Sequence, residues 1–497
     1  MLITLINPPQ VYSAGQLAGN VLPPLGLLYI ASVCEQEGHQ VKIIDAVVES
    51  PNSINNLSTG TSYRGLSINE IVETIPDESA MIGISSNLSC ADEIVKVLAE
   101  QIKKTKQGTL ILGGMHVSSD PEKALNSSQA DIVVKGEGEL VFKELIDSHA
   151  GRLDISKIKN IVYKQSGKVI SNDCDHAPVD INSLTFPNRA LIPLEKYQKI
   201  NEAHGPTQEK WTTIISSRGC PQGCSFCATT ALSNKKWRAL TASRVVDEIE
   251  HCYKTFGIKE FHFEDDNMTL DKKRIKEICS GIKARNLKIK WLAPNGVSAK
   301  AVDEEILLAM KESGCYHVTF APETGSVRVL TELMNKSEDL DRIKRLIKYS
   351  KKIKLNTAAF FMMGFPGETE KDLEVTIRYA KKLIKNGLDE ASFAGFIPLP
   401  GSKIYKEKFS NMKYYKELIS TPSISGLRSY APGITDIMLM NYIKKAYRQG
   451  FLYKMLYQPW NTIKSVWRIL FSNKQYLKTE RVGRQWLKQR IPLYKKK

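Results

Sequence analysis

Short, almost continuous apolar runs alternate with helical patterns along the first 150 residues of this 497-residue chain. The runs are rich in Ile, Val and Leu, which predicts strands buried on both faces, as in a parallel sheet. The segments between them place apolar residues at helical spacing, as in residues 25–38 and 91–104. We therefore expect an α/β domain over residues 1–150 with a doubly wound, Rossmann-like sheet. Its expected strands are 2–6, 41–45, 80–86, 109–114 and 131–136.

The alternation returns after residue 211 with six further apolar runs, and each of the first five precedes an amphipathic segment. Six such units over residues 211–405 fit a partial (β/α)6 barrel of the TIM type better than another flat sheet. In barrels of this type, the functional side chains gather in the loops that follow the carboxyl ends of the strands. The expected strands are 212–217, 260–265, 288–293, 316–321, 356–361 and 391–396.

Two parts of the chain fall outside these patterns. Residues 151–210 contain one hairpin pattern, which turns at Ser166-Gly167, and then a polar stretch with prolines, so they are predicted to be a connector. Residues 406–497 are expected to form a third, mostly helical and basic region. Within it, residues 436–471 interleave Met, Leu and aromatic residues with Lys and Arg.

The net charge of +17 is concentrated in this last region, because residues 430–497 carry 15 Lys and Arg against two acids. A basic helical segment with aromatic residues is typical of three kinds of contact. It can bind nucleic acid, lie on an anionic membrane or amphiphilic substrate, or cap the barrel mouth with a solvated basic face. The large apolar share disfavours nucleic acid. A peripheral membrane contact is preferred, and the cap remains open.

Cysteine usage and the lack of long apolar runs bear on the compartment. No uncharged apolar run reaches the roughly 20 residues of a spanning helix, and the first residues lack the basic stretch of a signal peptide. We expect a cytoplasmic protein, membrane-peripheral at most, whose thiols stay reduced. Six of the nine cysteines stand alone in the sequence and are expected to be small buried side chains. These are Cys34, Cys90, Cys174, Cys252, Cys279 and Cys315.

The other three cysteines, Cys220, Cys224 and Cys227, stand within eight positions in the stretch SSRGCPQGCSFC, directly after the first expected barrel strand. Thiolates are the usual ligands of iron–sulfur clusters and of structural zinc. Zinc needs a fourth ligand, and the only candidates are the isolated His262 and Cys279. A four-iron cluster held by three cysteines would leave one iron open for catalysis. Core thiols in a tight loop are the minor alternative.

The stretch CPQGCSFC resembles the C-x-x-x-C-x-x-C loop of the radical S-adenosylmethionine (SAM) superfamily, with the aromatic Phe226 before the last cysteine. In that family, the open iron of a [4Fe-4S] cluster binds the amino and carboxylate groups of SAM. The resemblance implies that Cys220, Cys224 and Cys227 ligate the cluster. It also implies a low-potential electron donor such as ferredoxin or flavodoxin as a partner.

Three later stretches resemble successive strand ends of that family. FHFEDDNMTLD resembles the second-strand segment, WLAPNGVSA the third, and TFAPETGS the fourth, where Ala321 and Thr324 depart from the pattern G-x-E-S-G-S. In FHFEDDNMTLD a structural role remains an alternative, in which Asp266 or Asn267 caps the following helix. The SAM contacts that the resemblance implies are Glu264, Asp265, Asp266, Asn295, Glu323 and Ser326.

The N-terminal domain resembles the cobalamin-binding domain that precedes many radical SAM enzymes, through the stretches NPP, GISS, LGGMH and VKGEGE. The D-x-H-x-x-G loop of some cobalamin proteins is absent, since NPPQVYSAG holds no histidine after the first strand. The resemblance therefore implies cobalamin bound without a His ligand from such a loop. The implied contacts to the corrin tail are Ser85, Ser86, Gly113, Gly114 and Gly136.

Together these resemblances cover residues 1–405 and are those of class B radical SAM methyltransferases. They imply methylation of an unactivated carbon of a hydrophobic or amphiphilic small molecule, through methylcobalamin and a 5′-deoxyadenosyl radical. One alternative is a radical SAM cyclase or C–C bond-forming enzyme on a lipid or tetrapyrrole. An enzyme of the RNA methylthiotransferase type is a second. A cobalamin- or redox-sensing protein without turnover is disfavoured, because the match extends beyond the cysteines.

Overall fold

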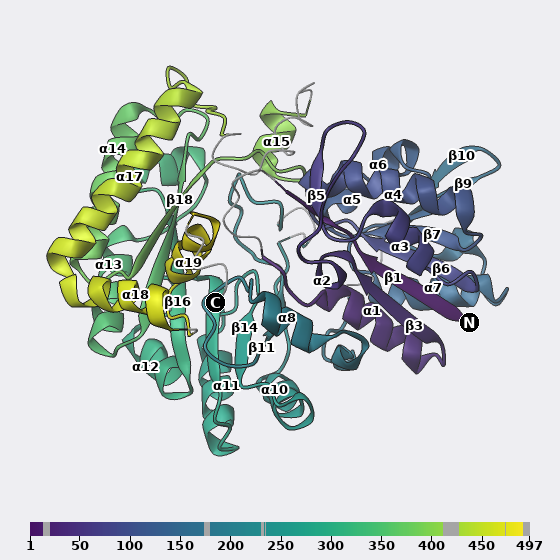
Figure 1. The fold of residues 1–497 in the computed structure, drawn as a ribbon, viewed down its shortest axis with the longest axis horizontal. Coiled ribbons are helices and arrows are strands. Elements are labelled where there is room, and N and C mark those ends of the chain that lie inside the picture. The colour runs from purple at the N-terminus through teal and green to yellow at the C-terminus, as the bar shows by residue number, and fades with distance from the viewer. Residues whose placement is uncertain are drawn as a thin grey trace. The chain divides into compact units, whose positions relative to one another are not determined.

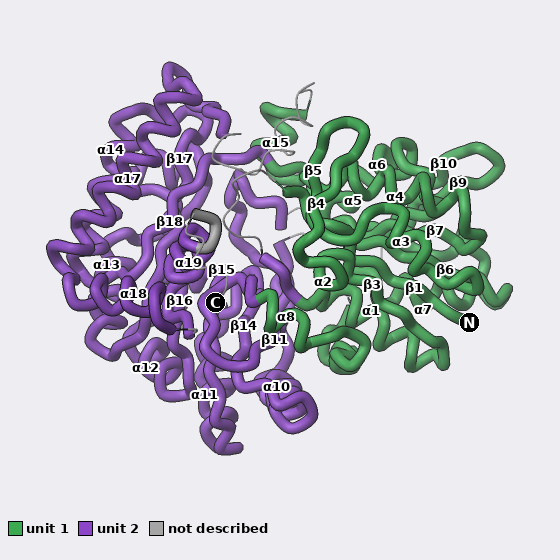
Figure 2. The backbone as a smooth tube through the Cα atoms, viewed as in Figure 1, with its two compact units in different colours: residues 1–14, 23–200, 399–422 green, residues 15–22, 201–398, 423–497 purple. Residues whose placement is uncertain are grey.

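The computed structural model describes residues 1–12, 20–172, 179–229, 233, 235–410, 427–472 and 474–490, and for 488–490 the backbone alone. The chain divides into two compact units, which Figure 2 shows in different colours. The first unit comprises residues 1–14, 23–200 and 399–422, and the second comprises residues 15–22, 201–398 and 423–497.

Seven strands form the main sheet of the first unit, in the order β10-β9-β8-β7-β6-β1-β3 (Figure 1). Five adjacent strands of this sheet, β3, β1, β6, β7 and β8, run parallel. Their order is that of flavodoxin-like doubly wound sheets, so the predicted fold class is confirmed. The strands of this sheet are β1 (Leu2–Asn7), β3 (Gln40–Asp45), β6 (Ser79–Ser85), β7 (Thr109–Gly113), β8 (Ile132–Val134), β9 (Ile161–Gln165) and β10 (Lys168–Ser171). A small second sheet joins β2 (Gln10–Val11), β5 (Ser62–Arg64) and β4 (Ile54–Asn56).

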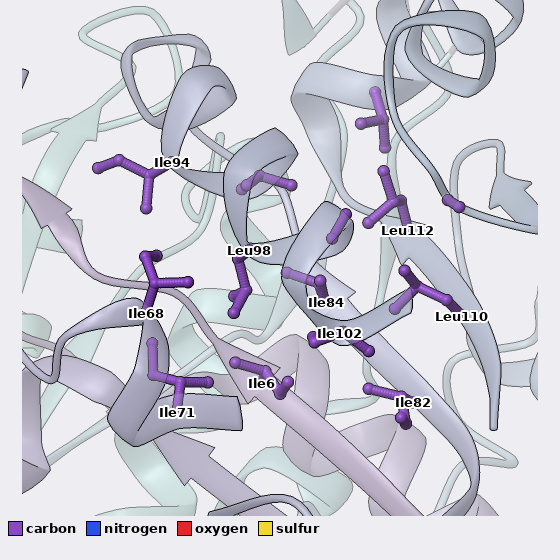
Figure 3. Close-up of a cluster of buried hydrophobic side chains, with 14 of the residues drawn as sticks. Ile6, Ile68, Ile71, Ile82, Ile84, Ile94, Leu98, Ile102, Leu110 and Leu112 are labelled. Carbon is purple, nitrogen blue, oxygen red and sulfur yellow. The ribbon is translucent and has the colours of Figure 1, made fainter. Parts of the chain in front are cut away.

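Helices cover both faces of the main sheet, which explains why its strands are continuously apolar. On one face, Ile82 and Ile84 of β6 pack with Leu98 of α4, as Figure 3 shows. On the other face, Met81 of the same strand packs with Phe142 of α7. The principal helices of this unit are α1 (Leu25–Gln36), α3 (Ile68–Thr74), α4 (Asp92–Thr105), α7 (Glu139–His149) and α8 (Leu194–Ile200).

The hairpin expected inside a connector over residues 151–210 is instead part of the sheet. β9 pairs antiparallel with β8, for example at Val162 and Val133, and β10 pairs with β9. The physical reason is the apolar start of β9, where Ile161, Val162 and Tyr163 are all buried. A free hairpin would expose these side chains to water, and the sheet edge offers the surface that covers them.

Six parallel strands form the open barrel of the second unit, in the order β11-β14-β15-β16-β17-β18. A helix follows each of the first five, as the sequence predicts. The strands are β11 (Trp211–Ile214), β14 (Glu260–Phe263), β15 (Lys290–Val297), β16 (Cys315–Glu323), β17 (Asn356–Met363) and β18 (Glu390–Gly395). The helices are α10 (Ala242–Phe256), α11 (Lys272–Ala284), α12 (Glu304–Glu312), α13 (Leu340–Lys352) and α14 (Glu370–Lys385). A short ribbon pairs β12 (Ser217–Arg218) with β13 (Arg238–Ala239).

Three helices complete the second unit: α17 (Asp436–Tyr457), α18 (Pro459–Phe471) and α19 (Lys478–Arg490). α17 packs on α14 and β18, so it takes the place of the sixth barrel helix (Figure 1). The backbone nitrogens of Lys478 and Thr479, at the start of α19, donate to the carboxylate of Glu390, the first residue of β18. α19 therefore covers the amino-terminal ends of the strands. The expectation of a cap over the barrel mouth is wrong for this helix, because it closes the opposite end.

Candidate active site

A cavity of about 310 Å³ lies at the carboxyl-terminal ends of the barrel strands. The cysteine loop forms one side of it, and residues at or after the carboxyl-terminal ends of β14, β15 and β16 form the rest. Seven of the nine residues predicted for the cluster and SAM line this single cavity. They are Cys220, Cys224, Cys227, Asp265, Asp266, Asn295 and Glu323.

The cysteine loop begins with a backbone turn that only glycine fits. Gly219 has φ +82°, and a Cβ atom there would lie 2.2 Å from the carbonyl oxygen of Lys236. The nitrogen of Gly219 donates to Oδ2 of Asp266 at 2.9 Å, and Thr229 Oγ1 donates to Oδ1 of the same carboxylate at 3.2 Å. Asp266 thus holds both ends of the loop. The capping alternative is wrong, because the N-cap of α11 is Asp271.

The carboxylate of Asp265 binds residues that support the cavity. Its buried carboxylate accepts hydrogen bonds from the nitrogen of Ser216 at 3.0 Å and from the hydroxyls of Ser216 and Ser217 at 2.6 Å each. Burial raises the pKa of Asp265, and these hydrogen bonds oppose the increase. The side chain therefore joins the end of β11 to the end of β14, which fixes the point where the cysteine loop starts.

The three thiols line the cavity together. Asn267 Nδ2 donates to Cys220 Sγ at 3.7 Å. Burial raises the pKa of Cys224 to about 11 and also raises the pKa of Cys227, so these two thiols are protonated until a metal binds. Within the described part of the chain, no three His, Cys, Asp or Glu side chains converge to hold a single metal ion. A cluster of several irons needs no such convergence, because each cysteine ligates a different iron. The donor set fits a [4Fe-4S] cluster.

The far side of the cavity is built around a buried ion pair. Lys336 Nζ donates to Glu323 Oε1 at 2.8 Å and to the carbonyl oxygen of Ala321 at 2.6 Å. Burial lowers the pKa of Lys336, but the Glu323 carboxylate outweighs it and the pKa is raised. Glu323 has φ +62°, a left-handed backbone that a residue with a Cβ seldom adopts outside functional sites.

Two buried acceptor atoms in the cavity wall, Asn267 Oδ1 and Glu338 Oε2, have no hydrogen-bond partner among the described residues. Buried polar atoms are normally paired, so these two fit a bound molecule that offers N–H or O–H donors. SAM carries such donors in its amino group and its ribose hydroxyls. The residues present therefore fit SAM as well as the cluster.

Sequence reasoning missed Lys336 and Glu338. They follow the π-helical turn Val329–Leu333, which carries the chain back towards the end of β16. Nothing in their local sequence marks this return. The only available signal is the glutamate of TFAPETGS, since a buried carboxylate needs a cation nearby.

Two predicted SAM contacts stand outside the cavity lining. The carboxylate of Glu264 pairs with Nδ1 of His204 at 3.0 Å, and Ser326 Oγ donates to Asp372 Oδ1 at 2.6 Å. Both side chains thus have structural partners within the barrel. Asn295 does line the cavity, and its Nδ2 donates to the carbonyl oxygen of Asp265 at 3.4 Å.

The predicted cobalamin contacts gather at the carboxyl edge of the sheet in the first unit. Ser85 ends β6 and Ser86 follows it, and the nitrogen of Ser86 donates to the carbonyl oxygen of Gly113 at 2.6 Å. Gly136 follows β8 by two residues. The strand order reverses between β1 and β6, where ligands of doubly wound sheets bind. Ser86 Oγ is buried without a hydrogen-bond partner among the described residues.

Gly114 makes a tight turn at this edge. Its φ is +117°, and a Cβ atom would lie 2.6 Å from Asn87 Oδ1 and 2.7 Å from the carbonyl oxygen of Ser86. Leu88 and Met115 expose large apolar side chains beside the turn. His116 is tied to Ser89 Oγ at 2.9 Å and to Asp92 at 3.2 Å, so the structure gives it local partners. A bulky ligand with polar and apolar parts, such as cobalamin, fits this edge.

Sequence profiles of two known families match the chain. The radical SAM superfamily matches residues 214–380, and the B12 binding domain matches residues 14–146. An uncharacterized methyltransferase of Pyrococcus horikoshii is 30% identical over 465 residues, which cover 92% of this chain and 95% of that protein. Cytidylyl-2-hydroxyethylphosphonate methyltransferase of Streptomyces wedmorensis is 31% identical over 438 residues, 82% of this chain and 81% of that protein.

Anaerobic magnesium-protoporphyrin IX monomethyl ester cyclase of Rubrivivax gelatinosus is 26% identical over 462 residues, 91% of this chain and 78% of that protein. Two solved structures share the fold. The radical SAM methyltransferase TsrM of Kitasatospora setae, with cobalamin and a [4Fe-4S] cluster bound, has a TM-score of 0.68 at 18% identity and covers 87% of this chain and 79% of its own. The cobalamin-dependent enzyme OxsB, with aqua-cobalamin bound, has a TM-score of 0.59 at 20% identity and covers 90% and 61%. Because the Pyrococcus relative matches at 30% identity along 92% of the sequence, this chain belongs to the cobalamin-dependent radical SAM methyltransferases.

Proposed function

We propose that this enzyme transfers a methyl group from SAM to an unactivated carbon of a small hydrophobic or amphiphilic molecule in the cytoplasm. The observation that carries the proposal is the single cavity where three thiols meet four polar side chains at the barrel mouth. The two relatives named above with at least 30% identity are methyltransferases by name, whereas the cyclase is 26% identical. Methyl transfer is therefore preferred to cyclisation.

Each group of residues has a distinct part in this proposal. Cys220, Cys224 and Cys227 would hold the cluster, and Asp266 would keep their loop closed. Glu323, fixed by Lys336, would accept hydrogen bonds from SAM. When bound, the cluster supplies the electron that cleaves SAM, and cobalamin carries the methyl group.

The first unit would hold cobalamin at the carboxyl edge of its sheet. Ser85, Ser86 and the backbone around Gly113, Gly114 and Gly136 offer hydrogen-bonding groups there without bulk. Radical SAM enzymes act on small molecules and need a reductant, and the proposed reductant is a ferredoxin or flavodoxin. The chain would exclude water from the bound cofactors and leave the chemistry to them.

The test uses the full chain, reconstituted without oxygen with iron, sulfide and hydroxocobalamin. It is given SAM with a deuterated methyl group, a reductant and a small-molecule extract of cells that lack the gene. We expect 5′-deoxyadenosine, S-adenosylhomocysteine and a product that carries the deuterated methyl group. Cys220→Ala should form no 5′-deoxyadenosine and still bind cobalamin. Substrate-dependent 5′-deoxyadenosine without a labelled product would contradict methyl transfer and favour the cyclase.

A further inference from the structure

Helix α18 has its polar side against the protein and its apolar side in solvent. Thr462 and Ser465 are each 8% exposed, whereas Trp460 is 74% exposed and Phe471 is 65% exposed. The hydrophobic effect favours the opposite orientation for a helix on the surface of a water-soluble domain. Its apolar side is therefore arranged for contact with something other than water.

The last turns of α17, which contacts α18, also expose large apolar side chains. Leu456, near the end of α17, is 69% exposed. Contiguous exposed apolar patches are uncommon on monomeric proteins and mark interaction sites. We call this surface the apolar face, and its members are Phe451, Leu452, Met455, Leu456, Trp460, Ile463, Val466, Trp467 and Phe471.

Polar contacts hold α18 in this orientation. Ser465 Oγ donates to Glu480 Oε1 at 3.0 Å, and Arg468 pairs with the same carboxylate at 3.2 Å. At the start of the helix, Gln458 Nε2 donates to the carbonyl oxygens of Ile384 at 2.8 Å and Leu388 at 2.9 Å. Rolling the helix to bury its tryptophans would break these buried hydrogen bonds. The apolar face is thus part of the fold.

Positive charges predominate around the apolar face, although Lys445, Arg468 and Lys474 pair with Glu374, Glu480 and Glu209 of other elements. Residues 437–479 contain eight Lys and Arg and no Asp or Glu. Lys464 is exposed on α18, and Arg448 is exposed on α17. From α14, Lys381 lies over the ring of Tyr453 at 5.0 Å, and Lys385 lies over the ring of Tyr457 at 5.2 Å. A second copy of this surface would be repelled, and an anionic partner would be attracted.

We propose that the apolar face binds the surface of an anionic phospholipid bilayer. Trp, Phe and Leu would enter the boundary between headgroups and acyl chains, while Lys464 and Arg448 would contact the phosphates. None of the described helices is long and apolar enough to cross a bilayer, so the contact is peripheral.

This surface is separate from the cofactor cavity. Gln458 contacts residues that precede β18, at the amino-terminal ends of the strands, whereas the cavity lies at their carboxyl-terminal ends. Bilayer binding would therefore anchor the enzyme, and the bilayer would form no part of the cofactor cavity. Variants of the apolar face should keep the ability to cleave SAM.

The experiment measures sedimentation of the full chain with phosphatidylcholine vesicles, with and without phosphatidylglycerol. We expect binding that requires phosphatidylglycerol and weakens at high salt. The double variant Trp460→Ser/Trp467→Ser should bind at least tenfold more weakly. Lys464→Gln should bind about fivefold more weakly, since one basic residue near the surface contributes that factor. Leu308→Ser, a matched control at an exposed apolar position of α12, should bind like the wild type.

Two further measurements keep the test decisive. Thermal unfolding and 5′-deoxyadenosine formation should be unchanged in every variant, because the replaced side chains are exposed and none of them lines the cavity. Failure of the wild type to bind anionic vesicles would overturn the proposal, as would equal binding by the double variant. A dimer of the wild type that the double variant abolishes, without vesicle binding, would assign the apolar face to self-association instead. None of these measurements depends on the substrate.

Discussion

Asp266 accepts a hydrogen bond from the backbone nitrogen of Gly219 at 2.9 Å, so a carboxylate after β14 closes the loop that starts after β11. The two residues are 47 positions apart in sequence. The bond fixes a loop whose first residue has φ +82° and no space for a side chain. We therefore expect cluster binding to depend on Asp266 through the shape of this loop.

Replacement of Asp266 should lower cluster loading. Asp266→Ala removes the acceptor for Gly219 and Thr229, so the loop is no longer held at either end. We expect less iron per chain after reconstitution, measured by iron and sulfide analysis, with partial recovery in Asp266→Asn. Asp271→Ala is the matched control, because it removes only the cap of α11 and should cost about 1 kcal/mol of stability. Equal iron in both alanine variants would contradict the role of Asp266.

Loss of the Lys336 charge should destabilise the barrel and weaken SAM binding. Lys336→Met leaves the Glu323 carboxylate buried without its cation, which costs about 3 kcal/mol in comparable sites. Urea unfolding measures the first effect, and calorimetric titration with SAM measures the second. The double variant Lys336→Met/Glu323→Gln should regain most of the stability and none of the SAM affinity. A double variant that is no more stable than the single one would show that the two residues do not interact.

Glu368 should make the protein less stable as the pH rises from about 4.5 to about 7. Burial raises its pKa to about 7, although the nitrogens of Gly364 and Phe365 donate to it at 2.7 and 3.1 Å. Between these values the native state holds a proton that the unfolded state has lost. The free energy of unfolding therefore falls with rising pH, by about 3 kcal/mol in total.

The test for Glu368 is a comparison with Glu368→Gln by urea unfolding at pH 5 and pH 7. Stability of the variant relative to the wild type should increase between these two pH values. The comparison must be a difference, because burial lowers the pKa of His317 to about 4. That histidine makes stability rise with pH over the range from about 4 to 6.5, in the opposite direction. A difference independent of pH would refute the prediction.

Gly114→Ala should weaken cobalamin retention without affecting cluster loading. The new methyl group would lie 2.6 Å from Asn87 Oδ1 and push the carboxyl edge of the sheet out of shape. Absorption of the corrin that stays with the protein after gel filtration measures the loss. Gly38→Ala is the control, since Gly38 also has a positive φ, +79°, but stands in open space before β3. If both variants retain the same amount of cobalamin, the edge around Gly114 does not bind it.

How far the sequence led can be judged from particular residues. Cys220 was found because three cysteines stand close together after the first barrel strand, and Asp266 was found because FHFEDDNMTLD resembles a strand end of the radical SAM family. Both lie at one edge because β11 and β14 are parallel neighbours. Lys336 was not found, because its place depends on a π-helical turn that no periodicity marks. The hairpin at Ile161 was recognised, but its partner β8 was not, since pairing at a sheet edge is decided by tertiary packing. Residues 436–471 were recognised as a basic helical segment with aromatic residues, but only the burial of Thr462 and Ser465 shows which side of α18 faces the protein.

Glu480 joins α18 to α19, the helix that closes the barrel. The stabilities of these two helices are therefore thermodynamically linked. The carboxylate of Glu480 accepts from Ser465 of α18 and from the nitrogen of Tyr476, just before α19. A surface that binds α18 only in the native state adds its binding free energy to that of unfolding, about 2.7 kcal/mol at a hundredfold excess over Kd. The melting temperature of the barrel would then depend on the surroundings of the protein. The enzyme would be more heat-resistant in the cell than in dilute buffer.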